Sequence, residues 1–146
     1  MNKFKNKIKH SFDSKASSYD EYSLVQREVA KRLCERLSSI KIKPLHILDI
    51  GCGTGYLSNL LYKLFPNSSI TCMDISINML NEVHKKNPKL NCILSDAENM
   101  PFKKSKFDLV VSSFTFHWCD EVEKIFSDVH RFLRDKGLFL FTTVGP

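Results

Sequence analysis

The strongest constraint on the fold is a short glycine-rich segment between a strand-like run and a helix-like run. Residues 45–50 (LHILDI) form a short apolar run closed by glycines, which predicts a buried strand. The segment DIGCGTG then places Gly51, Gly53 and Gly55 at alternate positions. Glycine lets a chain turn tightly and lets a ligand lie against bare backbone, and the start of a helix offers free N–H donors. We therefore predict a ligand-binding turn that leads from a strand into a helix.

The glycine spacing argues against two nucleotide-binding loops. A dinucleotide-binding turn has the pattern G-x-G-x-x-G, but here the third glycine comes one residue early and Tyr56 occupies its place. A phosphate-binding P-loop needs Gly-Lys-Ser/Thr at its end, and none follows. The turn is therefore expected to serve a different ligand.

Strand-like and helix-like segments alternate after this turn. Short apolar runs predict further strands over residues 69–74, 90–94, 107–113 and 138–143. Apolar residues at helical spacing predict helices over residues 55–64, from Ser76 as N-cap to before Pro88, and over 120–134 with Gly137 as terminator. Apolar rather than alternating strands in this order predict an α/β, Rossmann-like fold with a mainly parallel sheet and helices on its faces.

The first 44 residues differ from the rest in charge. Residues 1–46 hold 11 Lys and Arg against 5 Asp and Glu, whereas residues 47–146 hold 11 of each, so the whole net charge of +6 lies in the first part. Apolar residues four apart (Phe4, Ile8, Phe12) predict a short amphipathic helix there, and residues 20–39 predict a second one. We expect a basic helical arm over 1–44 and a ligand-binding domain over 45–146.

Composition excludes several classes of protein. No apolar run approaches the roughly 20 residues of a membrane span, and the basic start lacks the apolar stretch of a secretory signal. The five cysteines contain no C-x-x-C pair, which predicts reduced thiols, no metal site and a cytoplasmic location. No basic run interleaved with aromatic residues points to nucleic acid, and neither nucleic acid nor membrane is an expected partner.

Acidic residues follow the second and third predicted strands. Ligands of open parallel sheets bind beyond the carboxyl ends of the strands. Asp74 ends the second strand and precedes Ile75, and a carboxylate there can accept from both hydroxyls of a ribose. Asp96 follows the third strand, where it can accept from the amino group of an adenine while Ala97 leaves room for the ring. The alternative for Asp74 is that it simply starts a turn before Ser76, and the alternative for Asp96 is a loop cap.

This order of motifs resembles the class I S-adenosylmethionine-dependent methyltransferases over residues 45–143. The resemblance implies S-adenosyl-L-methionine as cofactor, with the glycines along its amino-acid portion, Asp74 on its ribose and Asp96 near its adenine. The implied cofactor-binding residues are Asp49, Gly51, Gly53, Gly55, Asp74, Ile75, Asp96, Ala97 and Ser112.

Three segments narrow the resemblance. Residues 8–22 (IKHSFDSKASSYDEY), 96–102 (DAENMPF) and 112–119 (SSFTFHWC) look like those of the malonyl-acyl-carrier-protein O-methyltransferases of biotin synthesis, although His117 replaces a more common Gln. This implies methylation of the free carboxylate of malonyl-acyl carrier protein. Several of these pieces recur in other small-molecule methyltransferases, so an enzyme of the quinone-pathway type is the alternative.

A malonyl carboxylate is already ionised at pH 7, so its methylation needs no general base and depends on positioning and desolvation. Tyr19 and His117 are the candidates for the substrate pocket. The Tyr19 hydroxyl would hold the malonyl carboxylate or close the cofactor site, with packing of the arm as the alternative. We interpret His117 as a shape or hydrogen-bonding residue rather than a base.

The basic arm suits an acidic partner such as acyl carrier protein. The cations that would supply this surface are Lys3, Lys5, Lys7, Lys9, Lys15, Arg27, Lys31, Arg32 and Arg36. In the family the sheet continues beyond strand five with further strands and a helical cap, whereas this sequence ends at Pro146. We therefore expect a fold truncated after strand five, and a cofactor-binding fragment without activity is a further alternative.

Overall fold

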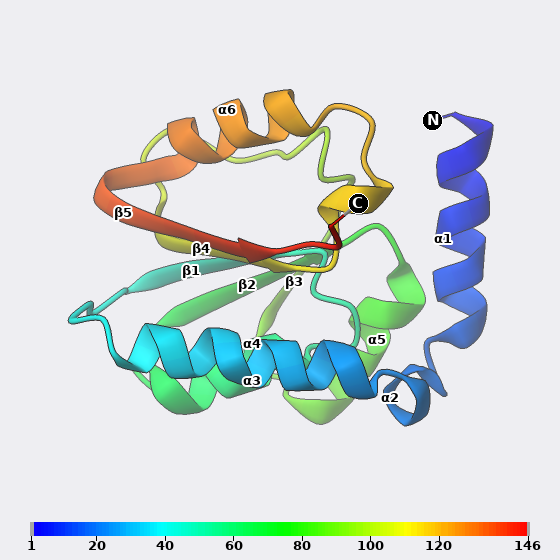
Figure 1. Ribbon diagram of the computed structural model, residues 1–146, viewed down its shortest axis with the longest axis horizontal. Coiled ribbons are helices and arrows are strands. Elements are labelled where there is room, and N and C mark those ends of the chain that lie inside the picture. Colours follow the sequence, from blue (N-terminus) through cyan, green and yellow to red (C-terminus); the bar gives the residue numbers. More distant parts are fainter. Residues whose placement is uncertain (1, 146) are drawn as a thin grey trace.

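A single parallel sheet with the strand order β3-β2-β1-β4-β5 organises residues 2–145, the part of the chain that the computed structural model describes (Figure 1). The terminal Met1 and Pro146 lie outside the described residues. The strands are β1 (His46–Ile50), β2 (Ser69–Asp74), β3 (Asn91–Leu94), β4 (Phe107–Ser113) and β5 (Leu133–Thr142). The helices are α1 (Lys3–Lys15), α2 (Tyr19–Tyr22), α3 (Leu24–Ser38), α4 (Tyr56–Leu64), α5 (Ile77–Lys86) and α6 (Val122–Phe132), with a 3-10 turn at Phe116–Trp118.

The two faces of the sheet carry separate cores. On one face, Ile47 of β1 packs with Leu37 of α3 and Leu61 of α4. Its neighbour Leu48 belongs to the opposite core, which Ile125 of α6 helps to form, because successive residues of a strand point to opposite faces. Figure 1 shows α6 on one side of the sheet and α3, α4 and α5 on the other. This arrangement confirms the predicted α/β, Rossmann-like fold.

The largest differences from the predicted elements lie at residues 133–137 and at Ser23. The helix expected over 120–134 ends at Phe132, and Leu133 already pairs with Phe107 as the first residue of β5. The register between β4 and β5 then shifts between Phe107 and Leu109, so Gly137 lies within β5 and does not terminate a helix. The helix expected over 20–39 is interrupted at Ser23, whose φ of −101° and ψ of 36° are not helical.

The topology places β1 between β2 and β4, so the loops after these strands meet at one edge of the sheet. Helix α1 stands beyond the carboxyl ends of the strands (Figure 1) and packs against α5. None of the helices within residues 2–145 has both the length and the apolar character that a membrane span requires.

Candidate functional site

Two adjoining cavities lie at the carboxyl ends of the strands. Counting the space that is open to solvent, the first holds about 750 Å³ and the second about 460 Å³. Four residues line both cavities: Tyr19, Gly51, Gly53 and Ser113. A ligand in the first cavity would therefore extend past the glycine turn into the second.

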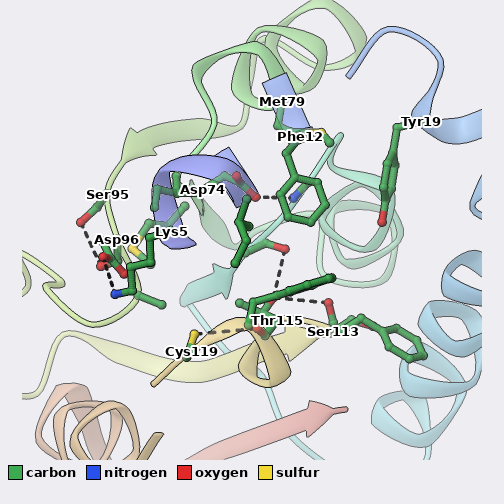
Figure 2. Close-up of a pocket in the computed structure, with 18 residues that line it drawn as sticks. Lys5, Phe12, Tyr19, Asp74, Met79, Ser95, Asp96, Ser113, Thr115 and Cys119 are labelled. Atoms are coloured by element: carbon green, nitrogen blue, oxygen red, sulfur yellow. Dashed lines mark hydrogen bonds and ion pairs between the residues drawn. The ribbon is translucent and has the colours of Figure 1, made fainter. Parts of the chain in front are cut away.

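The first cavity brings together the residues predicted for a nucleoside. Its wall includes Asp74 and Ile75 after β2 and Asp96 and Ala97 after β3. Figure 2 shows the side chains of this wall with Phe12 of α1 and Tyr19 beside them. The rest of the lining is mostly apolar and includes Ile8, Met73, Met79, Phe114 and Trp118.

Asp74 connects the glycine turn to the start of α5. Its Oδ2 accepts a hydrogen bond from the Gly53 N–H at 2.9 Å, and its Oδ1 accepts from the Ser76 N–H at 2.9 Å. Burial raises the pKa of Asp74, while these N–H groups lower it. Each carboxylate oxygen can accept a second hydrogen bond, so Asp74 still has acceptor capacity for a ligand in the cavity that it lines.

The glycine turn leaves bare backbone beside both cavities. Gly51 has a φ of +68°, and a Cβ there would lie 2.1 Å from Thr115 Oγ1. Gly53 has a φ of +54°, and a Cβ there would meet nothing within 4 Å. The turn therefore excludes a side chain at Gly51 on steric grounds, whereas Gly53 faces open space in which a ligand can lie. Gly55 lines neither cavity, because its position packs against Val83 of α5.

Asp96 is held by a residue that the sequence analysis assigned to a partner surface. Its Oδ2 accepts from Lys5 Nζ at 2.8 Å and its Oδ1 from the Glu98 N–H at 2.9 Å. Lys5 shares one face of α1 with Ile8 and Phe12, and all three line the first cavity. The spacing i, i+3, i+7 could have identified this face, but a lysine within it was interpreted as solvent-exposed.

The second cavity is bounded by the glycine turn and the start of α3. Arg27 lines it, with its Nη1 donating to the Asp20 carbonyl at 3.1 Å and its guanidinium 5.4 Å from the centre of the Tyr56 ring. Ser23 also lines it, and its Oγ is buried with no hydrogen-bond partner among residues 2–145. A buried hydroxyl without a partner is costly, which points to a polar ligand group in this cavity. No pattern in the sequence singles out Ser23, and the prediction of Arg27 as a surface cation is replaced by its place in the lining of this cavity.

Tyr19 stands where the two cavities join. Its ring packs edge-on against Phe12, with 6.5 Å between the ring centroids. Burial, together with the charges of Asp74 and Asp20, raises the pKa of Tyr19, so its hydroxyl keeps its proton at neutral pH. Tyr19 can therefore donate a hydrogen bond to an acceptor in either cavity.

Two predicted residues lie beside the cavities rather than in their walls. Ser112 is buried and donates from Oγ to the Ile50 carbonyl at 2.8 Å, while its neighbour Ser113 lines both cavities. His117 is exposed, lies 4.7 Å from Trp118 between ring centroids, and lines neither cavity. Partial desolvation by its neighbours lowers the pKa of His117. Within residues 2–145, no group of three or more His, Cys, Asp or Glu side chains is arranged to hold a metal ion.

Asp49 lines the second cavity and is almost completely buried, at 1% exposure. Its Oδ2 accepts from Ser58 Oγ at 2.6 Å. Burial raises the pKa of this carboxyl to about 7; the hydrogen bond from Ser58 opposes this shift, and the charge of Asp74 adds to it. Asp49 therefore keeps its proton to a higher pH than an exposed aspartate does.

The raised pKa of Asp49 predicts that the contribution of this group to stability falls between about pH 4 and pH 7. The folded chain keeps this proton while the unfolded chain releases it near its ordinary pKa of 3.8, so the contribution of Asp49 to stability is greatest below that value and falls until pH passes about 7. Three pKa units correspond to about 4 kcal/mol. We expect urea unfolding of the Asp49→Asn variant to lose this decline, and equal pH slopes in variant and parent would contradict the assignment.

Comparisons with known proteins agree with this geometry. The methyltransferase domain family matches residues 48–141. The malonyl-[acyl-carrier protein] O-methyltransferase of Legionella pneumophila is 38% identical over 144 residues, which cover 97% of this chain and 51% of that protein. The chain thus spans about half the length of the curated relatives that it matches.

Solved structures share the fold. A candidate S-adenosyl-L-methionine-dependent methyltransferase from Methanococcus maripaludis superposes with a TM-score of 0.79 at 26% identity, covering 90% of this chain and 64% of that one. Phosphoethanolamine N-methyltransferase 1 of Haemonchus contortus was solved with phosphoethanolamine and S-adenosylhomocysteine. It superposes with a TM-score of 0.78 at 18% identity, and the match covers 94% of this chain and 32% of that one. At an identity of 18%, the likeness to this second structure concerns the fold alone.

Proposed function

This chain belongs to the S-adenosyl-L-methionine-dependent methyltransferases, and we propose that it transfers a methyl group to the free carboxylate of malonyl-acyl carrier protein. S-adenosyl-L-methionine is its cofactor. The observation that carries the finer assignment is its identity of 30% to 38% with curated malonyl-[acyl-carrier protein] O-methyltransferases. Each such match covers at least 95% of this chain but only about half of the relative, so the acceptor is a proposal.

The first cavity suits the nucleoside part of the cofactor. We place the ribose hydroxyls at Asp74 beside Ile75, and the adenine amino group at Asp96 beside Ala97. The support is that these four residues share one wall with bare backbone at Gly53, where a Cβ would meet nothing within 4 Å. A carboxylate accepts hydrogen bonds, so Asp74 matches the hydroxyl donors of the ribose and Asp96 matches the amino donor of the adenine.

The second cavity suits the amino-acid end of the cofactor. Its carboxylate would accept from the Arg27 guanidinium and from the buried Ser23 hydroxyl, which has no partner in the described chain. Hydrogen bonds between a guanidinium and a carboxylate are among the strong ones. Gly51 and Gly53 line both cavities, so they would lie beside the part of the cofactor that connects its nucleoside to its amino-acid end.

The proposed reaction requires no proton transfer by residues of this chain. When bound, the cofactor supplies a methyl group on a positively charged sulfur, which departs as a neutral thioether. A malonyl carboxylate is ionised at pH 7, so no residue has to remove a proton from it. Tyr19 would donate a hydrogen bond to this carboxylate from the junction of the cavities, while Phe12 and Trp118, whose rings pack edge-on in the lining of the first cavity, would cover part of it. His117 lines neither cavity, so we assign it no role in proton transfer.

The exposed side of the arm over residues 1–44 would face the carrier protein, while its cavity-lining residues would join residues 45–146 in holding the cofactor. Burial removes Lys5 from the cations available to a partner, and Arg27 lines the second cavity. Of the other cations predicted for this surface, Lys9 is half-buried, and the exposed ones are Lys3, Lys7, Lys15, Lys31, Arg32 and Arg36. Attraction between this surface and an acidic carrier protein would speed association at low salt.

Methyl transfer to defined acceptors tests the proposal. The purified chain is incubated with methyl-labelled S-adenosyl-L-methionine and either malonyl- or acetyl-acyl carrier protein. We expect a labelled methyl ester on the malonyl form and none on the acetyl form, which lacks the free carboxylate. Transfer to a small quinone-type acceptor instead would favour another small-molecule methyltransferase. Cofactor binding without transfer to any acceptor would identify a cofactor-binding unit that lacks this activity alone.

A further inference from the structure

Helix α1 presents a lysine to the interior where its neighbours along the face are apolar. Lys5 is 9% exposed and is the one buried residue within Lys3–Lys15. It lines the first cavity together with Ile8 and Phe12. A buried ammonium group is costly unless charged partners surround it, so its placement requires an explanation.

Two carboxylates meet the Lys5 ammonium. Its Nζ lies 2.8 Å from Asp96 Oδ2 and also forms an ion pair with Glu98 Oε2. Glu98 in turn accepts from the Asp120 N–H at 2.6 Å through its other oxygen. Figure 2 shows Lys5 beside Asp96 and Ser95 on one wall of the cavity. The ion pair thus connects α1 to the loop after β3.

The ion pair of Lys5 and Asp96 offers a ligand a hydrogen-bond donor beside a hydrogen-bond acceptor. An ammonium group has three N–H donors, and within the described chain two carboxylates accept from Lys5, which leaves one donor for the cavity. Adenine presents an amino donor beside a ring-nitrogen acceptor, whereas a 6-oxopurine presents an oxygen acceptor in place of that amino group. The wall formed by Lys5 and Asp96 is therefore complementary to adenine.

We propose that Lys5 is a positioning residue of the cofactor site, which holds Asp96 toward the adenine amino group and makes the site selective against 6-oxopurines. The inference rests on the proposed contact between Asp96 and adenine. It also makes α1 a part of the nucleoside site. Because coupling between two equilibria is reciprocal, cofactor binding would stabilise the docked arm as much as the docked arm favours cofactor binding.

Ligand selectivity of a Lys5→Met variant tests this role. Binding of S-adenosylhomocysteine and of S-inosylhomocysteine, its 6-oxo analogue, is followed by the fluorescence of Trp118, the single tryptophan, which lines the cavity. We expect the parent to prefer the adenosyl ligand by about tenfold or more and Lys5→Met to lose most of this preference. Lys7→Met removes an exposed lysine of the same helix and should keep the preference.

The ratio of the two affinities separates positioning from folding. If Lys5 had a merely structural role, its loss would weaken the binding of both ligands by the same factor. A ratio of the two affinities in Lys5→Met that equals the parent's would therefore overturn the inference. If that variant does not fold, Lys5→Gln is read in the same way, and Lys5→Arg, which keeps the charge, should retain the preference. Equal binding of the two ligands by the parent would instead overturn the adenine contact of Asp96 on which the inference rests.

Discussion

The Gly51→Ala variant is expected to lose cofactor binding and about 2–5 kcal/mol of stability. Its Cβ would lie 2.1 Å from Thr115 Oγ1 and 2.6 Å from Thr115 Cγ2. Thr115 cannot yield freely, because its Oγ1 donates to the Ile50 carbonyl at 3.2 Å. The φ of +68° adds strain that alanine does not tolerate well. The collision would push the turn away from the exit of β4 and distort both cavities. Urea unfolding and S-adenosylhomocysteine titration measure the two losses.

Two further variants separate collision from backbone strain. Gly53→Ala carries similar strain at a φ of +54° but meets nothing within 4 Å, so it should lose only about 1–2 kcal/mol while its methyl group obstructs the ligand. The double variant Gly51→Ala with Thr115→Gly removes the collision and should recover part of the stability that Gly51→Ala alone loses. If Gly51→Ala unfolds at the same urea concentration as Gly53→Ala, the collision with Thr115 is not what requires glycine at this position.

Most of the sheet could be predicted from local patterns because β1, β2 and β4 are short and mostly apolar runs. The runs over 69–74 and 107–113 coincide with β2 and β4 at both ends. The segment 133–137 could not be predicted in this way. Leu133 continues the apolar stripe of α6 in sequence, yet it pairs with Phe107 across the sheet. That pairing, and the register shift after it, depend on tertiary contacts that helical spacing does not encode.

The same division applies to the site. Asp74 and Asp96 could be predicted from their places after strands, because the carboxyl ends of parallel strands meet at one edge, and both line one cavity. Lys5, Ser23 and Arg27 come from the arm, whose packing over that edge has no local signature. A lysine in a basic helix and an arginine among exposed cations both resemble solvated residues. Their burial becomes visible only when the arm is docked.

The Asp74→Ala variant is expected to bind S-adenosylhomocysteine at least about a hundredfold more weakly than the parent. Hydrogen bonds to a charged acceptor contribute about 1.5–3 kcal/mol each, and the proposed ribose contact has two. The substitution also releases the Gly53 N–H and the Ser76 N–H, which donate to this carboxylate at 2.9 Å each. The loss would therefore combine a ligand contact with a loosened turn. Titration followed by Trp118 fluorescence measures their sum.

Comparing adenosine with 2′,3′-dideoxyadenosine isolates the ligand contact. The parent should bind adenosine more tightly, because only adenosine offers the two ribose hydroxyls to Asp74. Asp74→Ala should bind the two nucleosides nearly equally, since a loosened turn weakens both alike. Asp13→Ala is the matched control. Asp13, like Asp74, accepts a hydrogen bond from the backbone at the start of α5, in this case from the Asn78 N–H at 3.3 Å, but it lines neither cavity. It should keep the parent's preference for adenosine. The same preference in Asp74→Ala as in the parent would remove Asp74 from the ribose site and leave it as a tether of the glycine turn.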